Sequence, residues 1–130
     1  MKNNAIKTFT LIFLSLLVLG ACGSNNAPTP AASAQINLIT NPDPPVKGSV
    51  QLFVDIKDAQ GQPLNAANVL VLVSHATMSN MIQQSQARAQ GNGRYVTQAD
   101  LSGMTGQWLI TVQVSKGALN LAQDFKIEVK

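Results

Sequence analysis

Apolar and polar residues alternate with a period of two over most of residues 36–130, and this pattern constrains the fold more than any other feature of the sequence. Successive side chains of a β-strand point to opposite faces of a sheet, so this period indicates strands with one buried face. The apolar run Val-Leu-Val-Leu-Val at residues 69–73 indicates a strand that is central in a sheet. No segment beyond residue 22 sustains a helical period, and we therefore expect an all-β domain.

Turn signals separate the alternating segments. They are Asp58–Pro63, the strong hairpin signal Gly91-Asn92-Gly93, the stretch Ser102–Gly106 and the pair Lys116-Gly117. Together with the alternation, they predict about seven strands, at residues 36–40, 49–57, 67–74, 82–90, 94–101, 107–115 and 119–129. Many short strands separated by regular turns are typical of an immunoglobulin-like antiparallel β-sandwich.

Residues 82–90 are the weakest of these predicted strands. Their sequence, Ile-Gln-Gln-Ser-Gln-Ala-Arg-Ala-Gln, has no apolar alternation. The same composition suits a short helix equally well, so both structures remain open for this segment.

The first 22 residues have the three parts of a secretory signal. Lys2 and Lys7 precede an apolar run at residues 11–19, and small residues follow it. The run is about half the roughly 20 residues that a membrane-spanning helix needs. Its end, Leu19-Gly20-Ala21-Cys22, resembles the lipobox of bacterial lipoproteins, which implies a lipid on Cys22 and cleavage after Ala21. The alternatives are an ordinary secretory signal with a chance cysteine and an uncleaved anchor.

This interpretation divides the chain into a signal peptide at residues 1–21, a tether at 22–35 and a domain at 36–130. The tether is small, polar and proline-bearing, which is typical of a flexible linker. We expect the domain to lie outside the cytoplasm, anchored to the outer membrane or to the outer face of the cytoplasmic membrane. Cys22 is the only cysteine, so no disulfide can form within the chain.

The charge of the chain argues against nucleic-acid binding. The formal net charge is +3, from 9 basic and 6 acidic side chains. Removal of Lys2 and Lys7 with the signal peptide leaves 7 basic side chains against 6 acidic ones, or +1. The sequence shows no basic patch and has few aromatic residues, so we expect no nucleic-acid partner.

The titratable residues do not form a recognisable catalytic set, and we expect no enzyme. His75 is the only histidine, and the acidic residues are scattered along the chain. Ser74 and His75 are neighbours on one predicted strand, so their side chains point to opposite faces. Tyr95 follows Gly93 at the start of a strand, where a tyrosine most often packs its ring and bonds its hydroxyl to nearby backbone.

Soft metal ligands concentrate around His75, with Met78 and Met81 after it and Met104 further along. If seven strands alternate in direction, the loops after the third and fifth strands lie at one end, which brings these residues together. Thioethers select Cu(I), and Trp108 would cap such a cation with its ring. In the other interpretation, the methionines plug the end of the sandwich and Trp108 is a core residue. Both remain open.

Several short motifs, taken in order, resemble YtkA-like and FixH-like domains over residues 36–130. They are the turn Asp58–Pro63 with Val69 after it, the methionines 78 and 81, and the motifs Gly93-Arg94-Tyr95 and Gly106-Gln107-Trp108. The resemblance implies an immunoglobulin-like sandwich on the outer side of a membrane, with no defined enzyme activity. It also implies, for some members, a role in metal transport, in particular of copper.

Two functions follow as expectations. The first is a lipid-anchored binding module that acts as a copper-handling accessory, with Cu(I) on His75, Met78, Met81 and Met104. The second is a metal-free structural or interaction module that docks a protein of the cell envelope.

Overall fold

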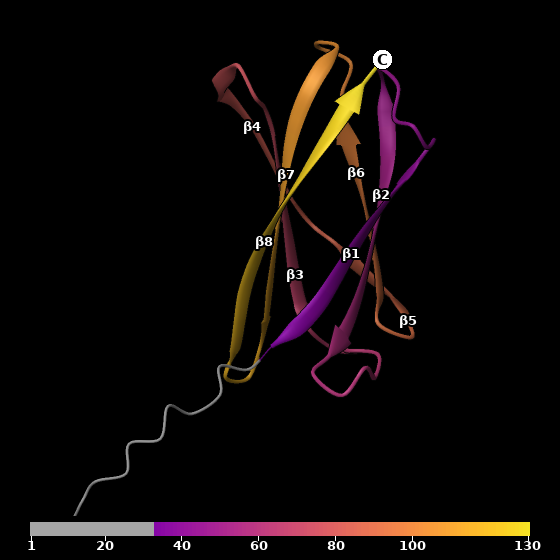
Figure 1. Cartoon of the computed structure of the whole chain (residues 1–130), viewed down its shortest axis with the longest axis vertical. Coiled ribbons are helices and arrows are strands. Elements are labelled where there is room, and N and C mark those ends of the chain that lie inside the picture. Colours follow the sequence, from indigo (N-terminus) through magenta and orange to yellow (C-terminus); the bar gives the residue numbers. More distant parts are fainter. Residues whose placement is uncertain (1–32) are drawn as a thin grey trace, which may run out of the picture.

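The structure is a computed structural model that describes residues 33–130, so the predicted signal peptide and most of the tether lie outside the described part. Within it the chain is all-β, without a helix, which confirms the predicted fold class (Figure 1). Accordingly, no helix of the described part has the length and apolarity to cross a membrane. The strands are β1 (Ala34–Asn41), β2 (Ser49–Asp58), β3 (Asn68–His75), β4 (Met78–Gln86), β5 (Arg88–Gly91), β6 (Arg94–Asp100), β7 (Gly106–Lys116) and β8 (Leu119–Val129).

The strands form two four-stranded antiparallel sheets that pack as a sandwich. The first, called sheet A, has the order β1-β2-β6-β5, and the second, sheet B, has the order β4-β3-β7-β8. β3 lies inside sheet B, between β4 and β7, as the apolar run at residues 69–73 predicts. The longest ladder joins β7 to β8, from Gly106 opposite Val129 to Lys116 opposite Leu119.

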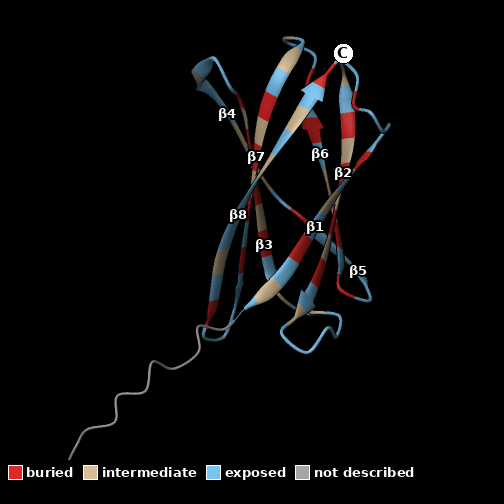
Figure 2. Cartoon of the chain, viewed as in Figure 1, coloured by how far each residue is buried: buried red, intermediate tan, exposed pale blue. Residues whose placement is uncertain are grey.

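The core lies between the inner faces of the sheets, and its residues follow the period of two (Figure 2). β2 shows this clearly, because every second residue from Val50 to Ile56 is at most 1% exposed. Trp108 and Tyr95 are the largest fully buried side chains, at 0% and 1% exposed. Burial of apolar surface of this kind is the main stabilising contribution to a domain without disulfides.

The prediction of one strand at residues 82–90 is wrong in its bounds, while the helical alternative is excluded. The segment contains two strands, β4 and β5, in different sheets, so the strand count is eight. The chain leaves sheet B at Ala87, whose N–H donates to the carbonyl of Val69, and joins sheet A at Arg88. Residues 82–90 are polar on both sides of Ala87, so the sequence carries no signal for the change from one sheet to the other.

The described chain enters the fold at one end of the sandwich, and a separate set of loops forms the opposite end (Figure 1). At the N-terminal end, Ala34 begins β1 opposite Asp58. At the other end, which we call the methionine end, lie the loops 42–48, 76–77 and 101–105 together with Lys130. There the N–H of Lys130 donates to the carbonyl of Pro45 at 3.3 Å.

Candidate functional site

The structure brings the predicted site residues to the methionine end. His75 ends β3, lies opposite Trp108 of β7 and also opposite Met78 of β4. Met81 reaches the neighbouring loop, because its Cε lies 3.3 Å from the position that a Cβ on Gly103 would take. Met104, in the same loop, is partly buried against the core.

His75 supports this end of the sandwich through both ring nitrogens. Its Nδ1 accepts the backbone N–H of Thr77 at 3.3 Å and lies 2.9 Å from the Thr77 hydroxyl. Its Nε2 lies 3.2 Å from the carbonyl oxygen of Thr105. An Nδ1 that accepts a backbone N–H is unprotonated, so Nε2 carries the proton and donates it to Thr105. The imidazole is 6% exposed, and its lone pair is already used in this conformation.

Trp108 lies in the core beneath His75. The two rings meet edge to face, with centroids 5.0 Å apart and planes at 89°. The indole Nε1 donates to the carbonyl of Met104 at 3.2 Å. The Trp108 indole is fully buried and His75 packs against it, so Trp108 is a core residue. Its hydrogen bond to Met104 also holds the 101–105 loop.

Three large apolar side chains of β4 are exposed at this end. Met78 is 42% exposed, Met81 40% and Ile82 60%. β4 is an edge strand of sheet B, and its pairing with β3 shifts register between Ser74 and His75. Because the pairing is irregular there, the start of β4 is an exposed apolar corner rather than a regular strand edge.

The donors at this end are thioethers rather than the common hard or borderline ligands. Among residues 33–130, no group of three or more His, Cys, Asp or Glu side chains is placed to hold a metal ion. Cys22 lies outside the described residues. With the lone pair of His75 committed to Thr77, the side chains that suit a soft cation here are Met78, Met81 and Met104.

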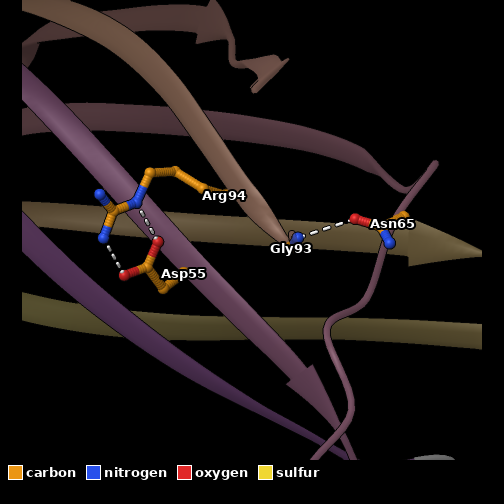
Figure 3. Close-up of polar contacts among 4 residues, drawn as sticks. All are labelled: Asp55, Asn65, Gly93 and Arg94. Carbon is orange, nitrogen blue, oxygen red and sulfur yellow. Dashed lines mark hydrogen bonds and ion pairs between the residues drawn. The ribbon is translucent and has the colours of Figure 1, made fainter. Parts of the chain in front are cut away.

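A second polar cluster, which the sequence does not predict, lies on the outer face of sheet A (Figure 3). Arg94 binds Asp55 with two parallel hydrogen bonds, of 2.6 and 2.7 Å. The guanidinium also lies 5.7 Å from the centre of the Phe53 ring. Hydrogen bonding to Arg94, aided by its charge, lowers the pKa of Asp55 despite some burial. The same pairing raises the pKa of Arg94. Only the register of β2 and β6, which places Arg94 opposite Asp55, would reveal this ion pair, and sequence alone does not give that register.

Tyr95 has the role that its position after Gly93 predicts. Its hydroxyl donates to the carbonyl of Leu64 at 2.7 Å and accepts the N–H of Ala67 at 3.0 Å. In addition, the Gly93 N–H donates to the Asn65 side chain at 2.7 Å (Figure 3). These bonds hold the connection between β2 and β3 against β6.

Comparisons with known proteins agree with this architecture. Among solved structures, the chain is similar to the Escherichia coli adhesin FdeC, with 26% sequence identity and a TM-score of 0.51. The match covers 77% of this chain and 32% of the adhesin chain, so this chain spans about a third of the length of that solved chain. No curated protein matches the chain significantly. The family model described as YtkA-like matches residues 30–113. This match covers more than half of the sequence, and the chain therefore belongs to the YtkA-like family.

Proposed function

We propose that this chain is an exported lipoprotein, acylated on Cys22, whose single domain is a non-catalytic binding module that works outside the cytoplasm. The observation that carries the proposal is the opposition of the two ends of the sandwich. β1 begins at the N-terminal end, whereas the exposed side chains of Met78, Met81 and Ile82 lie at the other. A tether to a membrane would therefore leave the methionine end facing away from it.

The ligand that we favour is a protein of the cell envelope, bound through the apolar corner of β4. Exposed methionines are flexible and polarizable, which suits them to contact surfaces. His75 and Trp108 support this corner from below, through bonds to the loops on both sides. The similarity to part of an adhesin favours a binding role over a catalytic one.

Cu(I) is the second candidate ligand, and the contact of Met81 with the 101–105 loop favours it. This contact places the thioether of Met81 beside the loop that carries Met104, and Met78 begins the same strand, β4. In this proposal the three thioethers bind the ion and His75 positions the loops. Binding by thioethers alone also suits an oxidising compartment, where thiolates are at risk.

Lipidation is tested by labelling growing cells with a radioactive fatty acid. The unsubstituted chain is expected to carry the label, and Cys22→Ala is expected to lose it. Incorporation that is equal in both chains contradicts acylation of Cys22.

The two ligands are separated by one pair of experiments on the acylated chain in detergent. Cu(I) is titrated against a competing chelator, under anaerobic conditions, with the triple variant Met78→Leu, Met81→Leu, Met104→Leu in parallel. Leucine conserves volume and removes the sulfur. Tight binding that disappears in the triple variant establishes the copper candidate, and binding that is equal in both chains rejects it.

For the protein ligand, a photo-crosslinking amino acid replaces Ile82 in living cells. The control position is Gln123, which is also exposed but lies on β8 of the same sheet. A discrete crosslinked species from position 82, absent from position 123, supports docking at the corner. Equal or absent crosslinking at the two positions counts against it.

A further inference from the structure

We propose a second binding site, a groove beside β6 that takes an extended peptide segment carrying a carboxylate. The groove lies where the chain changes sheets. β5 pairs with β6 only over Arg94–Val96, because the chain leaves sheet B at Ala87 and joins sheet A only at Arg88. Beyond Val96, no strand of the described chain pairs with β6 on this side.

The backbone of Gln98 points into this groove. In a strand, alternate residues direct their N–H and C=O groups to the same side. Asp100 faces the open side, because its N–H donates to Gln83 Oε1 at 3.0 Å and its carbonyl accepts from Gln83 Nε2 at 2.6 Å. The carboxamide of Gln83 thus replaces a neighbouring strand at Asp100. Gln98 has the same orientation and lies between this cap and the last residue paired with β5.

The groove has the size and the polarity for a short peptide segment. Its volume is about 470 Å³. Its lining consists of Gln51, Gln86, Arg88, Val96, Thr97 and Gln98. The Gln98 carboxamide offers a donor and an acceptor for a peptide backbone, and Val96 offers an apolar contact. The carboxamides of Gln51 and Gln86 each have one group bonded already, to Asn41 and Asn68.

Arg88 determines the charge of the ligand. It is exposed, and it takes part in no ion pair among residues 33–130, where the ion pair present is Arg94 with Asp55. Arginine pairs with carboxylates through two parallel hydrogen bonds, which adds both energy and direction. An extended segment that bridges to Gln98 would therefore be held best when it places an acidic side chain or a terminal carboxylate beside Arg88.

The free edge of β4 is a poorer site for such a segment. Its pairing is irregular near Ser74, and bulged edges resist further strand addition. Two of its side chains are already engaged, Gln83 with Asp100 and Gln86 with Asn68. It also carries no charged residue that would select a ligand.

The test uses the acylated full chain in detergent micelles and a short synthetic peptide of alternating valine and threonine with a central aspartate. Nuclear magnetic resonance is expected to show slowed exchange of the Gln98 amide and a shift of the Arg88 side-chain signal. The same peptide with asparagine in place of aspartate is expected to bind about tenfold more weakly, as for the loss of one charge-assisted hydrogen bond.

Two charge reversals separate the groove from general electrostatics. Arg88→Glu is expected to weaken binding at least about tenfold. Arg88→Lys, which keeps the charge and loses the two parallel hydrogen bonds, is expected to weaken it less. The matched control is Lys126→Glu, on the exposed face of β8, which is expected to leave binding unchanged. No binding, an equal effect of both reversals, or protection confined to residues 82–86 would each overturn the proposal. Met81→Leu is expected to leave peptide binding intact, so this site stands or falls separately from the methionine end.

Discussion

Tyr95 joins two segments that are far apart in the sequence. It lies on β6, and its hydroxyl bonds the carbonyl of Leu64 and the N–H of Ala67 before β3. Both partners are backbone groups, and the tyrosine itself is buried. Its hydroxyl therefore supplies the hydrogen-bond partner that these two backbone groups need.

The substitution Tyr95→Phe removes these two hydrogen bonds and keeps the ring. We expect the free energy of unfolding to fall by about 1–3 kcal/mol, the cost of leaving partly buried polar groups unsatisfied. Urea denaturation followed by Trp108 fluorescence measures this change, and the slope against urea is expected to stay constant. A loss below about 0.5 kcal/mol would mean that water reaches Leu64 and Ala67 in the variant.

The pair of Asp55 and Arg94 makes stability depend on pH in a defined direction. The pKa of Asp55 is lower in the folded chain than its ordinary value of 3.8. Such a group stabilises the fold above its unfolded pKa, and this contribution is lost as the pH falls through the lowered folded value. The side chains are 28% and 45% exposed, so the effect is expected to be small.

Asp55→Asn is expected to lower the urea midpoint modestly at pH 7 and to have no effect once the pH is below the folded pKa of Asp55. Denaturation curves of both chains from pH 7 down to about pH 2 check this. The control is Asp43→Asn, an exposed aspartate in the 42–48 loop, whose side chain has no hydrogen bond or ion pair with any of residues 33–130. A difference between the Asp55 chains that persists at the lowest pH would point to packing rather than charge.

Gly93 shows how one turn residue determines the contact between two elements. It is the last residue of the β5–β6 turn, with a φ of +72°, and a Cβ there would collide with the carbonyl oxygen of Ile56 and approach the N–H of Leu64. Gly61 has a similar φ of +79°, but a Cβ there would meet nothing within 4 Å. The two glycines therefore share the backbone strain of a substitution and differ in the collision.

We expect Gly61→Ala to cost about 1–2 kcal/mol, the strain of an L-residue in the left-handed region. Gly93→Ala is expected to cost at least about 2 kcal/mol more, because overpacking forces the backbone to shift. Thermal unfolding of the two variants gives the difference directly. Equal losses would mean that β2 and the segment at Leu64 yield to the added methyl group.

The elements that sequence predicts well are those whose inner face is apolar. β2, β7 and β8 alternate clearly and β3 is a continuous apolar run, and each lies within a residue or two of its predicted range. β4 does not, because Gln83 and Ser85 point inward as polar residues and bond Asp100 and Thr97 of β6. Their polar partners lie on another strand, so no pattern within residues 78–86 reveals the strand.

The candidate site divides in the same way. The gathering of His75, Met81 and Met104 at one end follows from the alternation of strand directions, which the sequence predicts. The hydrogen bonds of His75 do not, because its acceptor at Thr105 is a backbone carbonyl and carries no side-chain signature. For the same reason the groove beside Gln98 becomes visible only when the sheet change at Ala87 is known.

At the scale of the whole molecule, the arrangement of the ends predicts how the domain would stand on a membrane if Cys22 is acylated as proposed. Cys22 is the only cysteine, so its acylation would leave an introduced thiol as the one thiol available for labelling. We expect a fluorophore on Ala118→Cys, at the N-terminal end, to be quenched by a lipid-borne quencher in vesicles. The same fluorophore on Lys47→Cys, at the methionine end, is expected to be quenched much less. Equal quenching would mean that the domain lies flat on the bilayer.

The position of β1 also determines how the domain bears a pulling force. β1 starts at the N-terminal end and runs along β2 with eight paired residues, from Ala34 opposite Asp58 to Asn41 opposite Gln51. If the domain is anchored to a membrane through its N-terminus and a ligand bound at the methionine end is pulled away from that membrane, the pulling force acts along the axis of β1. The hydrogen bonds of this ladder lie across that axis, so they are loaded together in shear instead of parting one at a time. The topology is thus one that resists traction.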